Sequence, residues 1–296
     1  MISPELSKVI KMLRENKPDK ELTIEERRNN MEAMVALFPL ASDIQCQPVD
    51  ADGVSAEWVT APEATDNRVI LYLHGGGYVM GSIRTHREMV SHISRVAKAR
   101  VLLIDYRLAP EHPFPAAVED SKTAFQWLLK QGFAPNRIAL AGESAGGGLT
   151  IATLVDLRND KIALPAVAVC LSPWVDMEAI GPSMATKAES DPLVERGEIL
   201  KMAKAYLAGA DARTPLAAPI YADLNGLPPI LIQVGTSETL FDDALRLAER
   251  AKDAGVDVTL EPWEEMIHMW HFFASMAPEA KEAVQRIGSY ILERTS

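Results

Sequence analysis

Six short runs of aliphatic and β-branched residues, separated by helix-like stretches, constrain the fold of this chain more than any other feature. All lie after about residue 55, and in chain order they are NRVILYLHG, ARVLLIDYRL, RIALAGES, AVAVCLSPW, PPILIQVG and DVTLEPW. Most of them contain a continuous apolar stretch, as strands buried on both faces do. Strands of this kind that alternate with helices predict an α/β fold, in which a mostly parallel central sheet is flanked by helices.

One segment, residues 177–213, interrupts this alternation. It lies between two of the expected strands, has no strand pattern of its own and contains the helix-like stretch GEILKMAKAYL. We therefore expect an insertion into an α/β core formed by residues 46–176 and 214–296. Open α/β sheets place their sites at the carboxyl ends of the strands, and the insertion is expected to cover that edge as a cap.

Residues 1–45 predict two amphipathic helices that join this cap. Ser3 and Pro4 suit the cap and first position of one helix, and Thr23 with Glu26 matches a capping box for the other. The second helix is expected to continue as an apolar stripe of Met31, Met34, Val35 and Phe38. The expected organisation is one domain with a helical cap subdomain.

Composition and charge exclude several classes of protein. The chain is 48% hydrophobic and 24% charged, and no apolar run approaches the roughly 18 residues of a membrane span. Its first residues lack the apolar core of a secretory signal, so a cytoplasmic location is expected. A net charge of −11 argues against nucleic acid and anionic membranes as partners. Cys46 and Cys170 lack metal-ligand spacing, and we expect two buried, inert thiols with neither a disulfide nor a metal.

The pentapeptide Gly142-Glu143-Ser144-Ala145-Gly146 is the strongest chemical signal. It follows the strand-like RIALA directly and precedes the helix-like GGLTIATLVDL. A serine held on a sharp strand-to-helix turn projects its hydroxyl from the sheet edge, and glycines at either side let the backbone pass. A turn that only packs or binds an anion is the alternative, but the strand and helix around it favour a nucleophile.

The run His74-Gly75-Gly76-Gly77 ends the expected strand VILYL. Acyl transfer develops negative charge on a carbonyl oxygen, and consecutive glycines let backbone N–H groups converge on it. Together with the amide of Ala145 they predict an oxyanion hole. We interpret His74 as structural, a side chain that holds the glycine loop by a hydrogen bond, because it precedes the nucleophile whereas the usual order is Ser, acid, His.

That order directs the search for a base to the residues after Ser144, where only His268 and His271 occur. His268 is nearer the end of the last expected strand and is favoured as the base, with His271 as a packed helix residue. The acid is expected on the loop after ILIQVG, and Glu238 comes first there. Two further acids, Asp242 and Asp243, fall where helical periodicity begins, which fits a role at a helix start.

Together these motifs resemble those of the bacterial hormone-sensitive-lipase-like carboxylesterases of the α/β-hydrolase superfamily. The resemblance covers essentially the whole chain after about residue 65 and rests on HGGGY, DYRLAPEHPFPAA, GESAGG, LSPWVD, SDPLV and GTSETLFDDA. It implies esterase activity on short acyl chains, a cap, no cofactor, and an oxyanion hole at Gly76, Gly77 and Ala145. Glu143 and Glu238 stand where that family commonly has Asp.

Two groups of residues have less specific roles. The block DYRLAPEHPFPAA contains three prolines between a strand and a helix, which predicts a rigid connection under the site rather than a source of catalytic groups. Its polar members are Asp105, Arg107, Glu111 and His112. Large apolar residues in and near the insertion suit either an acyl pocket or the packing of the cap, and these are Trp174, Met177, Met184 and Tyr206.

The sequence as a whole predicts a serine carboxylesterase that acts on small acyl esters. Ser144 is the expected nucleophile, His268 the base and Glu238 the acid that orients the base. An amidase, peptidase or lactonase with the same triad is an alternative, because the triad serves any acyl transfer. A non-catalytic receptor on the same fold, as in the plant gibberellin receptors, is disfavoured because His268 is present. The physiological substrate and the oligomeric state, a homodimer included, are left open.

Overall fold

The strands expected from the sequence all form and pair side by side in one sheet. They are β3 (Thr65–Leu73), β4 (Ala99–Ile104), β5 (Ile138–Glu143), β6 (Val167–Leu171), β7 (Ile230–Gly235) and β8 (Val258–Trp263). The structure is a computed structural model and describes residues 2–16, 22–34 and 37–295. The sheet has the order β1-β2-β4-β3-β5-β6-β7-β8 and is parallel from β4 to β8. The α/β prediction is confirmed.

Two strands were missed, β1 (Gln45–Ala51) and β2 (Val54–Thr60). They form an antiparallel hairpin, and β2 also pairs antiparallel with β4. The hairpin turns at Asp52 and Gly53, which both have positive φ. An Asp-Gly pair between two strand-like runs is a strong hairpin signal, so this element was available from the sequence.

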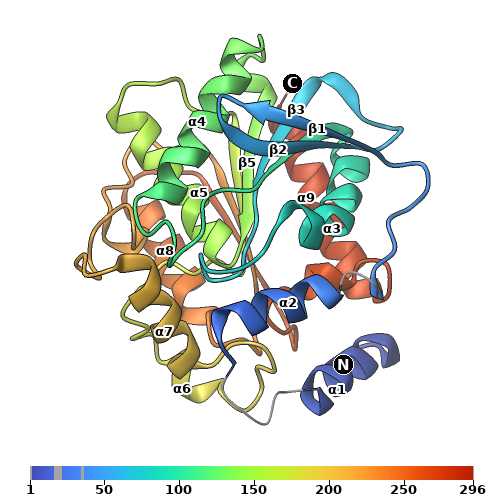
Figure 1. Ribbon diagram of the computed structural model, residues 1–296, viewed down its shortest axis with the longest axis vertical. Helices are drawn as coiled ribbons and strands as arrows, with labels where there is room; N and C mark the ends of the chain where they lie inside the picture. Colours follow the sequence, from blue (N-terminus) through green and yellow to red (C-terminus); the bar gives the residue numbers. More distant parts are fainter. Residues whose placement is uncertain (1, 17–21, 35–36, 296) are drawn as a thin grey trace.

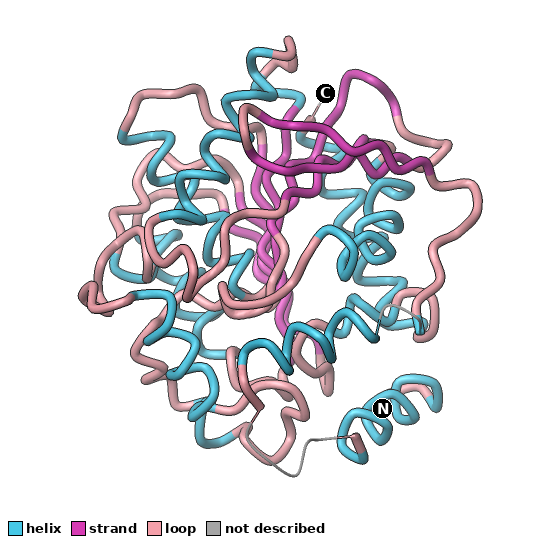
Figure 2. The backbone as a smooth tube through the Cα atoms, viewed as in Figure 1, coloured by secondary structure: helices cyan, strands magenta, loops and turns pink. Residues whose placement is uncertain are grey.

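Helices cover both faces of the sheet (Figures 1 and 2). On one face α3 (Ile83–Ala97) packs with α9 (Pro278–Arg294), and on the other α4 (Ala116–Lys130) packs with α5 (Ala145–Asn159), beside α8 (Phe241–Asp253). Side chains of β3 alternate between the two layers, because successive residues of a strand point to opposite faces. Leu71 and Leu73 join the layer of α4 and α5, whereas Tyr72 joins that of α3 and α9.

The sheet order places β3 between β4 and β5, so the connections leaving β3 and β4 run to opposite sides of β3. In open α/β sheets such a switch point creates a crevice at the carboxyl ends of the strands. The glycine loop follows β3 and Ser144 follows β5. The topology therefore brings the two strongest sequence motifs to neighbouring strand ends.

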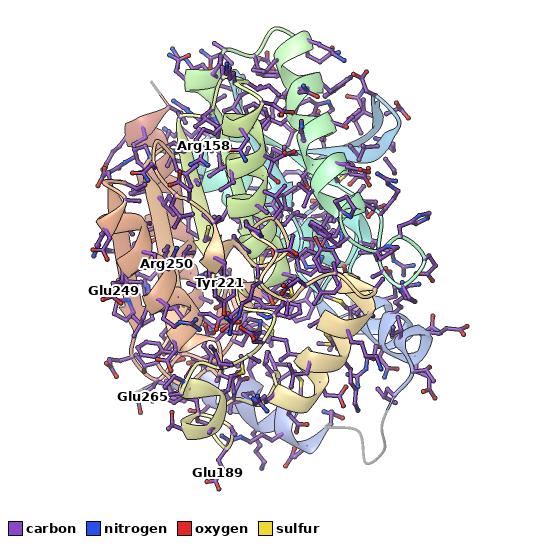
Figure 3. The ribbon with its side chains drawn as sticks, turned by 90° about the vertical axis from the view of Figure 1, so that its left-hand side faces the viewer. Arg158, Glu189, Tyr221, Glu249, Arg250 and Glu265 are labelled. Carbon is purple, nitrogen blue, oxygen red and sulfur yellow. The ribbon has the colours of Figure 1, made fainter. Side chains whose placement is uncertain are left out.

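The inserted segment lies at this same end of the molecule. It contains α6 (Ser183–Thr186) and α7 (Arg196–Leu207). In Figure 3, Glu189 of the insertion and Glu265, which follows β8, lie toward one end, whereas Arg158 at the end of α5 lies toward the other. From the N-terminal region, α1 (Pro4–Glu15) and α2 (Ile24–Met34) also lie at this end in Figure 1.

The two N-terminal helices begin at the expected residues, but they are attached to the rest of the molecule in different ways. Apolar residues of α1 are buried, whereas α2 is attached by charged groups. Ser3 accepts a hydrogen bond from the backbone N–H of Leu6, and Thr23 and Glu26 form the capping box. In α1, Leu6 and Val9 are buried in the layer of α3 and α9. The N-terminus of α1 is also bonded to α9 through Glu279.

The expected apolar stripe on α2 is wrong. No described residue of α2 is buried, and Met34 is 39% exposed. Of the other stripe residues, Met31 and Phe38 are only partly buried and Val35 lies outside the described residues. Charged groups hold α2 instead, and Arg28 donates to the carbonyl oxygens of Val79 and Ala109.

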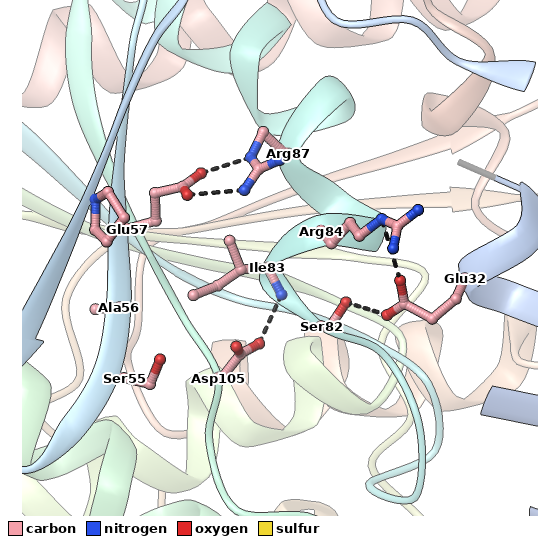
Figure 4. Close-up of a pocket in the computed structure, with 10 residues that line it drawn as sticks. Glu32, Ser55, Ala56, Glu57, Ser82, Ile83, Arg84, Arg87 and Asp105 are labelled. Atoms are coloured by element: carbon pink, nitrogen blue, oxygen red, sulfur yellow. Dashed lines mark hydrogen bonds and ion pairs between the residues drawn. The ribbon is translucent and has the colours of Figure 1, made fainter. Parts of the chain in front are cut away.

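Ion pairs also connect α2 to its neighbours. Arg27 pairs with Glu198 of α7, and Arg28 pairs with Glu111 at 2.7 Å. Glu32 accepts a hydrogen bond from Ser82 at the start of α3, beside a cavity of about 350 Å³ (Figure 4). Polar contacts, rather than apolar burial, thus connect this helix to the insertion and to the core.

The cysteines fit the expectation only in part. Cys170 is buried, but Cys46 on the edge strand β1 is half-buried. Both are free thiols, and partial burial together with the charge of Glu57 raises the pKa of Cys46 to about 11. Within the described ranges, no helix has the length and apolar character needed to cross a bilayer.

Candidate functional site

Ser144 sits at the turn between β5 and α5 with φ 54° and ψ −121°. A non-glycine residue rarely adopts such a conformation, and it is typical of a serine presented on a tight strand-to-helix turn. The turn leaves no room beside it. A Cβ atom on Gly142 would lie 2.3 Å from the carbonyl oxygen of Gly146, and one on Gly146 would lie 1.9 Å from that of Leu73. Both flanking positions therefore require glycine.

The structure brings the three proposed triad residues together. His268 lies on the turn after β8, and its Nε2 is 3.1 Å from Oγ of Ser144. Its Nδ1 is 3.4 Å from Oε2 of Glu238, which lies on the turn after β7. The second distance is longer than the usual hydrogen-bond range of roughly 2.7 to 3.2 Å, as such contacts often are without a substrate. Ser144 is 8% exposed, His268 3% and Glu238 is fully buried.

Burial and mutual contact set the electrostatics of this pair. Burial lowers the pKa of His268, but the contact and charge of Glu238 outweigh it and leave that pKa above its usual value. Burial has the opposite effect on the Glu238 carboxyl and raises its pKa, because burial disfavours the charged form of either group, whereas contact with His268 lowers it. A carboxylate at Nδ1 favours the tautomer that carries its proton there, so that the Nε2 lone pair faces Ser144.

Two residues that hold Glu238 were missed by the sequence analysis. Ser172, directly after β6, donates a hydrogen bond to Oε2 of Glu238 at 2.8 Å. Asp191, in the insertion, accepts from the backbone N–H of Thr239 at 2.8 Å. Both lie within motifs quoted above, LSPWVD and SDPLV, but no spacing in the sequence links either motif to the loop after β7.

The glycine loop leaves backbone donors beside Ser144. Gly76 and Gly77 have φ values of 105° and 63°, which suit glycine. The carbonyl oxygen of Gly76 accepts from the N–H groups of Val79 and Met80. Within the described part of the chain, the N–H groups of Gly76, Gly77 and Ala145 make no hydrogen bond. The predicted oxyanion-hole residues are thus free to donate.

His74 lies behind this loop rather than in it. Its Nδ1 is 2.7 Å from the carbonyl oxygen of Gly75, and its ring stacks on Tyr106 at 4.2 Å between centroids. Burial and the neighbouring His86 lower the pKa of His74 to about 3. The ring is therefore neutral at pH 7, and the protonated Nδ1 of one tautomer donates to Gly75.

The rejected candidates for base and acid lie elsewhere. His271, in η4 (Trp270–Phe273), is buried with Nε2 2.8 Å from Oε1 of Gln233, and burial lowers its pKa to about 3. Asp242 and Asp243 occupy the first turn of α8, as expected, but neither caps it. Asp242 accepts from the N–H of Ser183, and Asp243 accepts from the N–H groups of Val175 and Asp176. Their carboxylates bind the segment after β6 rather than their own helix.

The DYRLAPEHPFPAA block supplies structural contacts. Asp105 accepts from the N–H of Ile83 at the start of α3, Arg107 pairs with Asp120, and Glu111 pairs with Arg28. The four apolar residues that suited either a pocket or packing are buried in one layer with α5 and α7. Among them, Tyr206 stacks on Tyr78 at 3.8 Å. No cluster of three or more His, Cys, Asp or Glu positioned for a metal occurs among the described residues.

Comparison with known proteins agrees with this geometry. A family model described as alpha/beta hydrolase fold matches residues 70–272. An acetyl-hydrolase from Streptomyces hygroscopicus is 43% identical over 295 residues, which are 100% of this chain and 98% of that protein. The crystal structure of an esterase from the bacterial hormone-sensitive lipase family has a TM-score of 0.98 at 53% identity and covers 100% of both chains. The structure of EstE5 soaked by p-nitrophenyl butyrate has a TM-score of 0.96 at 51% identity and covers 99% of both.

Proposed function

Because the chain belongs to the hormone-sensitive-lipase-like carboxylesterases of the α/β-hydrolase fold, we propose that it hydrolyses short- to medium-chain acyl esters with a triad of Ser144, Glu238 and His268. Membership makes the protein a carboxylic ester hydrolase, and the proposal concerns its residues and its acyl range. The observation that carries it is the 3.1 Å distance between Nε2 of His268 and Oγ of Ser144, beside N–H groups that have no other acceptor among the described residues.

The reaction runs in two half-reactions. Oγ of Ser144 attacks the ester carbonyl carbon while its proton passes to Nε2 of His268. The tetrahedral adduct then breaks its bond to the alcohol oxygen, and His268 returns the proton to the departing alcohol. Water attacks the acyl-enzyme by the same route, gives its proton to His268 and releases the carboxylic acid, which restores the Ser144 hydroxyl.

Glu238 and the glycine loop act on the charges that develop in these steps. Glu238 keeps the proton of His268 on Nδ1 and stabilises the imidazolium. The N–H groups of Gly76, Gly77 and Ala145 donate to the carbonyl oxygen as it becomes negative. Such donors are worth about 10² to 10³ in kcat each in serine hydrolases.

The acyl range follows from the position of the cap. A Cβ atom on Gly77 would lie 2.3 Å from Sδ of Met202 in α7, so the insertion closes directly on the glycine loop. A covered site limits the length of the acyl chain. The similarity to an acetyl-hydrolase, and to a structure soaked by p-nitrophenyl butyrate, supports small acyl groups.

Replacement of the nucleophile tests the function. Ser144→Ala should abolish hydrolysis of p-nitrophenyl butyrate, and a fluorophosphonate should label the wild-type protein once, on the peptide that contains Ser144. Ser121→Ala is a matched control, because Ser121 is buried in α4 and its hydroxyl donates to the carbonyl oxygen of Ala117 in the same helix. Unchanged turnover in Ser144→Ala would contradict the proposal. An amide and a lactone in the same panel measure how far the triad acts beyond esters.

A cytoplasmic location stays a prediction from the sequence, and the oligomeric state, a homodimer included, stays open. Neither enters the mechanism, because every proposed group comes from one chain.

A further inference from the structure

A buried carboxylate beside the nucleophile has no part in the proposed triad. Glu143 ends β5, directly precedes Ser144 and is 1% exposed. Its Oε1 accepts a hydrogen bond from the backbone N–H of Gly75. The same oxygen lies 2.8 Å from Nε2 of His86, which is fully buried in α3. A carboxylate removed from water is costly unless partners replace the solvent, and these partners lie on two other elements of the fold.

Glu143 binds the backbone N–H of Gly75, and His74 binds its carbonyl oxygen. Gly75 donates its N–H to Glu143, and its carbonyl oxygen lies 2.7 Å from Nδ1 of His74. Both backbone polar groups of Gly75 are therefore bound before the chain reaches Gly76. The orientation of the next peptide groups, whose N–H groups are free among the described residues, depends on this anchored residue.

Glu143 and Gly75 are packed so closely that no side chain fits between them. A Cβ atom on Gly75 would lie 2.9 Å from Oε1 of Glu143 and 3.2 Å from Cβ of Ser144. The glycine loop thus touches the nucleophile turn at this point. Because packed atoms transmit displacements, a shift of the Glu143 side chain moves Gly75 relative to Ser144.

We propose that Glu143, held by His86, is a positioning residue that fixes Gly75 and so sets the place of the oxyanion-hole glycines relative to Ser144. This inference rests on the proposed function, since it assigns to Glu143 an effect on the same transition state. Glu143 is 1% exposed, so we expect it to make no contact with the substrate. It acts through Gly75, and the expected loss is therefore in kcat rather than in KM.

The negative charge of Glu143 also affects the pKa of His268, and this effect can be measured separately from the position of Gly75. Burial lowers the pKa of His268, and the charges of Glu238, Asp191 and Glu143 raise it. Loss of the Glu143 charge therefore lowers the pKa of His268, and the base becomes neutral at lower pH. The other titratable groups that face this carboxylate come from α3, β3 and the segment after β4, and they are His86, Tyr72 and Tyr106.

Three variants separate position from charge. Glu143→Ala removes both, Glu143→Gln keeps an oxygen acceptor without the charge, and Glu143→Asp keeps the charge on a side chain one methylene shorter. Glu57→Ala is the control, because Glu57 is also buried and ionic, but pairs with Arg87 at β2. For each variant, kcat and KM are measured for p-nitrophenyl butyrate, with the pH profile and the inhibition constant of butylboronic acid. The boronate forms a tetrahedral adduct on the nucleophile and reports on the oxyanion hole.

Glu143→Ala should lower kcat about 10- to 100-fold with KM changed less than about threefold, and should weaken the boronate by a similar factor. Glu143→Gln should lose less than about tenfold in kcat while its acid limb moves to lower pH. Glu143→Asp should lose more kcat than Glu143→Gln while its acid limb stays in place, because its carboxylate lies one methylene farther from Gly75. A Glu143→Ala enzyme that matches wild type in kcat and boronate affinity would overturn the inference, and a Glu143→Gln profile that does not move would overturn the charge effect alone. Labelling of Ser144 in the wild-type protein tests the function separately, so the two failures are distinguishable.

Discussion

Asp191 of the insertion accepts a hydrogen bond at 2.8 Å from the backbone N–H of Thr239, the residue that follows Glu238. Its other oxygen accepts from the N–H of Leu193. One buried side chain thus connects the cap to the loop that carries the proposed acid. We expect Asp191→Ala to lower kcat about 10- to 100-fold, because Glu238 loses its fixed place relative to His268 and small misplacements are costly in catalysis. Steady-state kinetics on p-nitrophenyl butyrate measure this.

Asp211→Ala is the control for that variant. Asp211 lies in the same insertion, but it is exposed and its carboxylate accepts from the backbone N–H of Arg213, within its own loop. It should leave kcat unchanged. Equal kcat values in Asp191→Ala and wild type would mean that the loop after β7 keeps its place without the insertion.

Glu238 rather than a neighbouring acid should control turnover. Glu238→Gln keeps the shape but favours the wrong tautomer of His268, so kcat should fall about 10²- to 10⁴-fold. Asp242→Asn should cost less than about tenfold, since that carboxylate binds a backbone N–H of the insertion and lies outside the triad. A large loss of kcat in Asp242→Asn, together with an active Glu238→Gln, would show that Asp242 is the triad acid.

Asp243→Asn should lower the stability of the fold rather than kcat. Asp243 is fully buried, and its Oδ2 accepts from two backbone N–H groups whereas its Oδ1 has no partner among the described residues. An amide keeps one acceptor oxygen but places an unpartnered NH2 in this site, which costs about 1 to 3 kcal/mol of the free energy of unfolding. Chemical denaturation measures this change. A variant with unchanged stability but lost kcat would place Asp243 in the catalytic machinery.

The sequence predicted what depends on local pattern. The apolar runs predicted β3 to β8, and the motif spacing together with the order Ser, acid, His selected Ser144, Glu238 and His268, which the structure brings together. The strands formed as predicted, and the three proposed residues lie together because a βαβ chain brings successive strand ends to one edge of the sheet. The chain order of the motifs then determines their place.

What the sequence did not predict depends on contacts between distant segments. Helical periodicity suggested an apolar face on α2, but its described residues are held mainly by ion pairs and polar hydrogen bonds. These reach residues far away in the chain, among them Glu198, Glu111 and Ser82. The roles of Ser172 and Asp191 were missed for the same reason. Ser172 binds Glu238, which lies 66 residues further along the chain, and Asp191 binds Thr239, which lies 48 residues further along.

Short acyl chains should be hydrolysed faster than long ones. The insertion closes on the glycine loop through Met202, so we expect the highest kcat/KM between about two and eight carbons, even though each buried CH₂ can add about 0.8 kcal/mol of binding. A series of p-nitrophenyl esters from acetate to palmitate measures this. A maximum at about sixteen carbons would show that α7 does not restrict the acyl site.

Activity should rise with pH as His268 loses its proton. The base accepts the Ser144 proton only when neutral, and contact with Glu238 holds the pKa of His268 above its usual value despite burial. The acid limb of kcat/KM should therefore have its midpoint above about 6.5, the value of an unperturbed imidazole. His74 and His271 have pKa values lowered to about 3 by burial and stay neutral over this range, so neither contributes. In Glu238→Gln the main cause of the raised pKa is gone, and the midpoint should move to lower pH. A flat profile between about pH 5 and about pH 9, or an unmoved midpoint in that variant, would contradict the coupling of this carboxylate to the base.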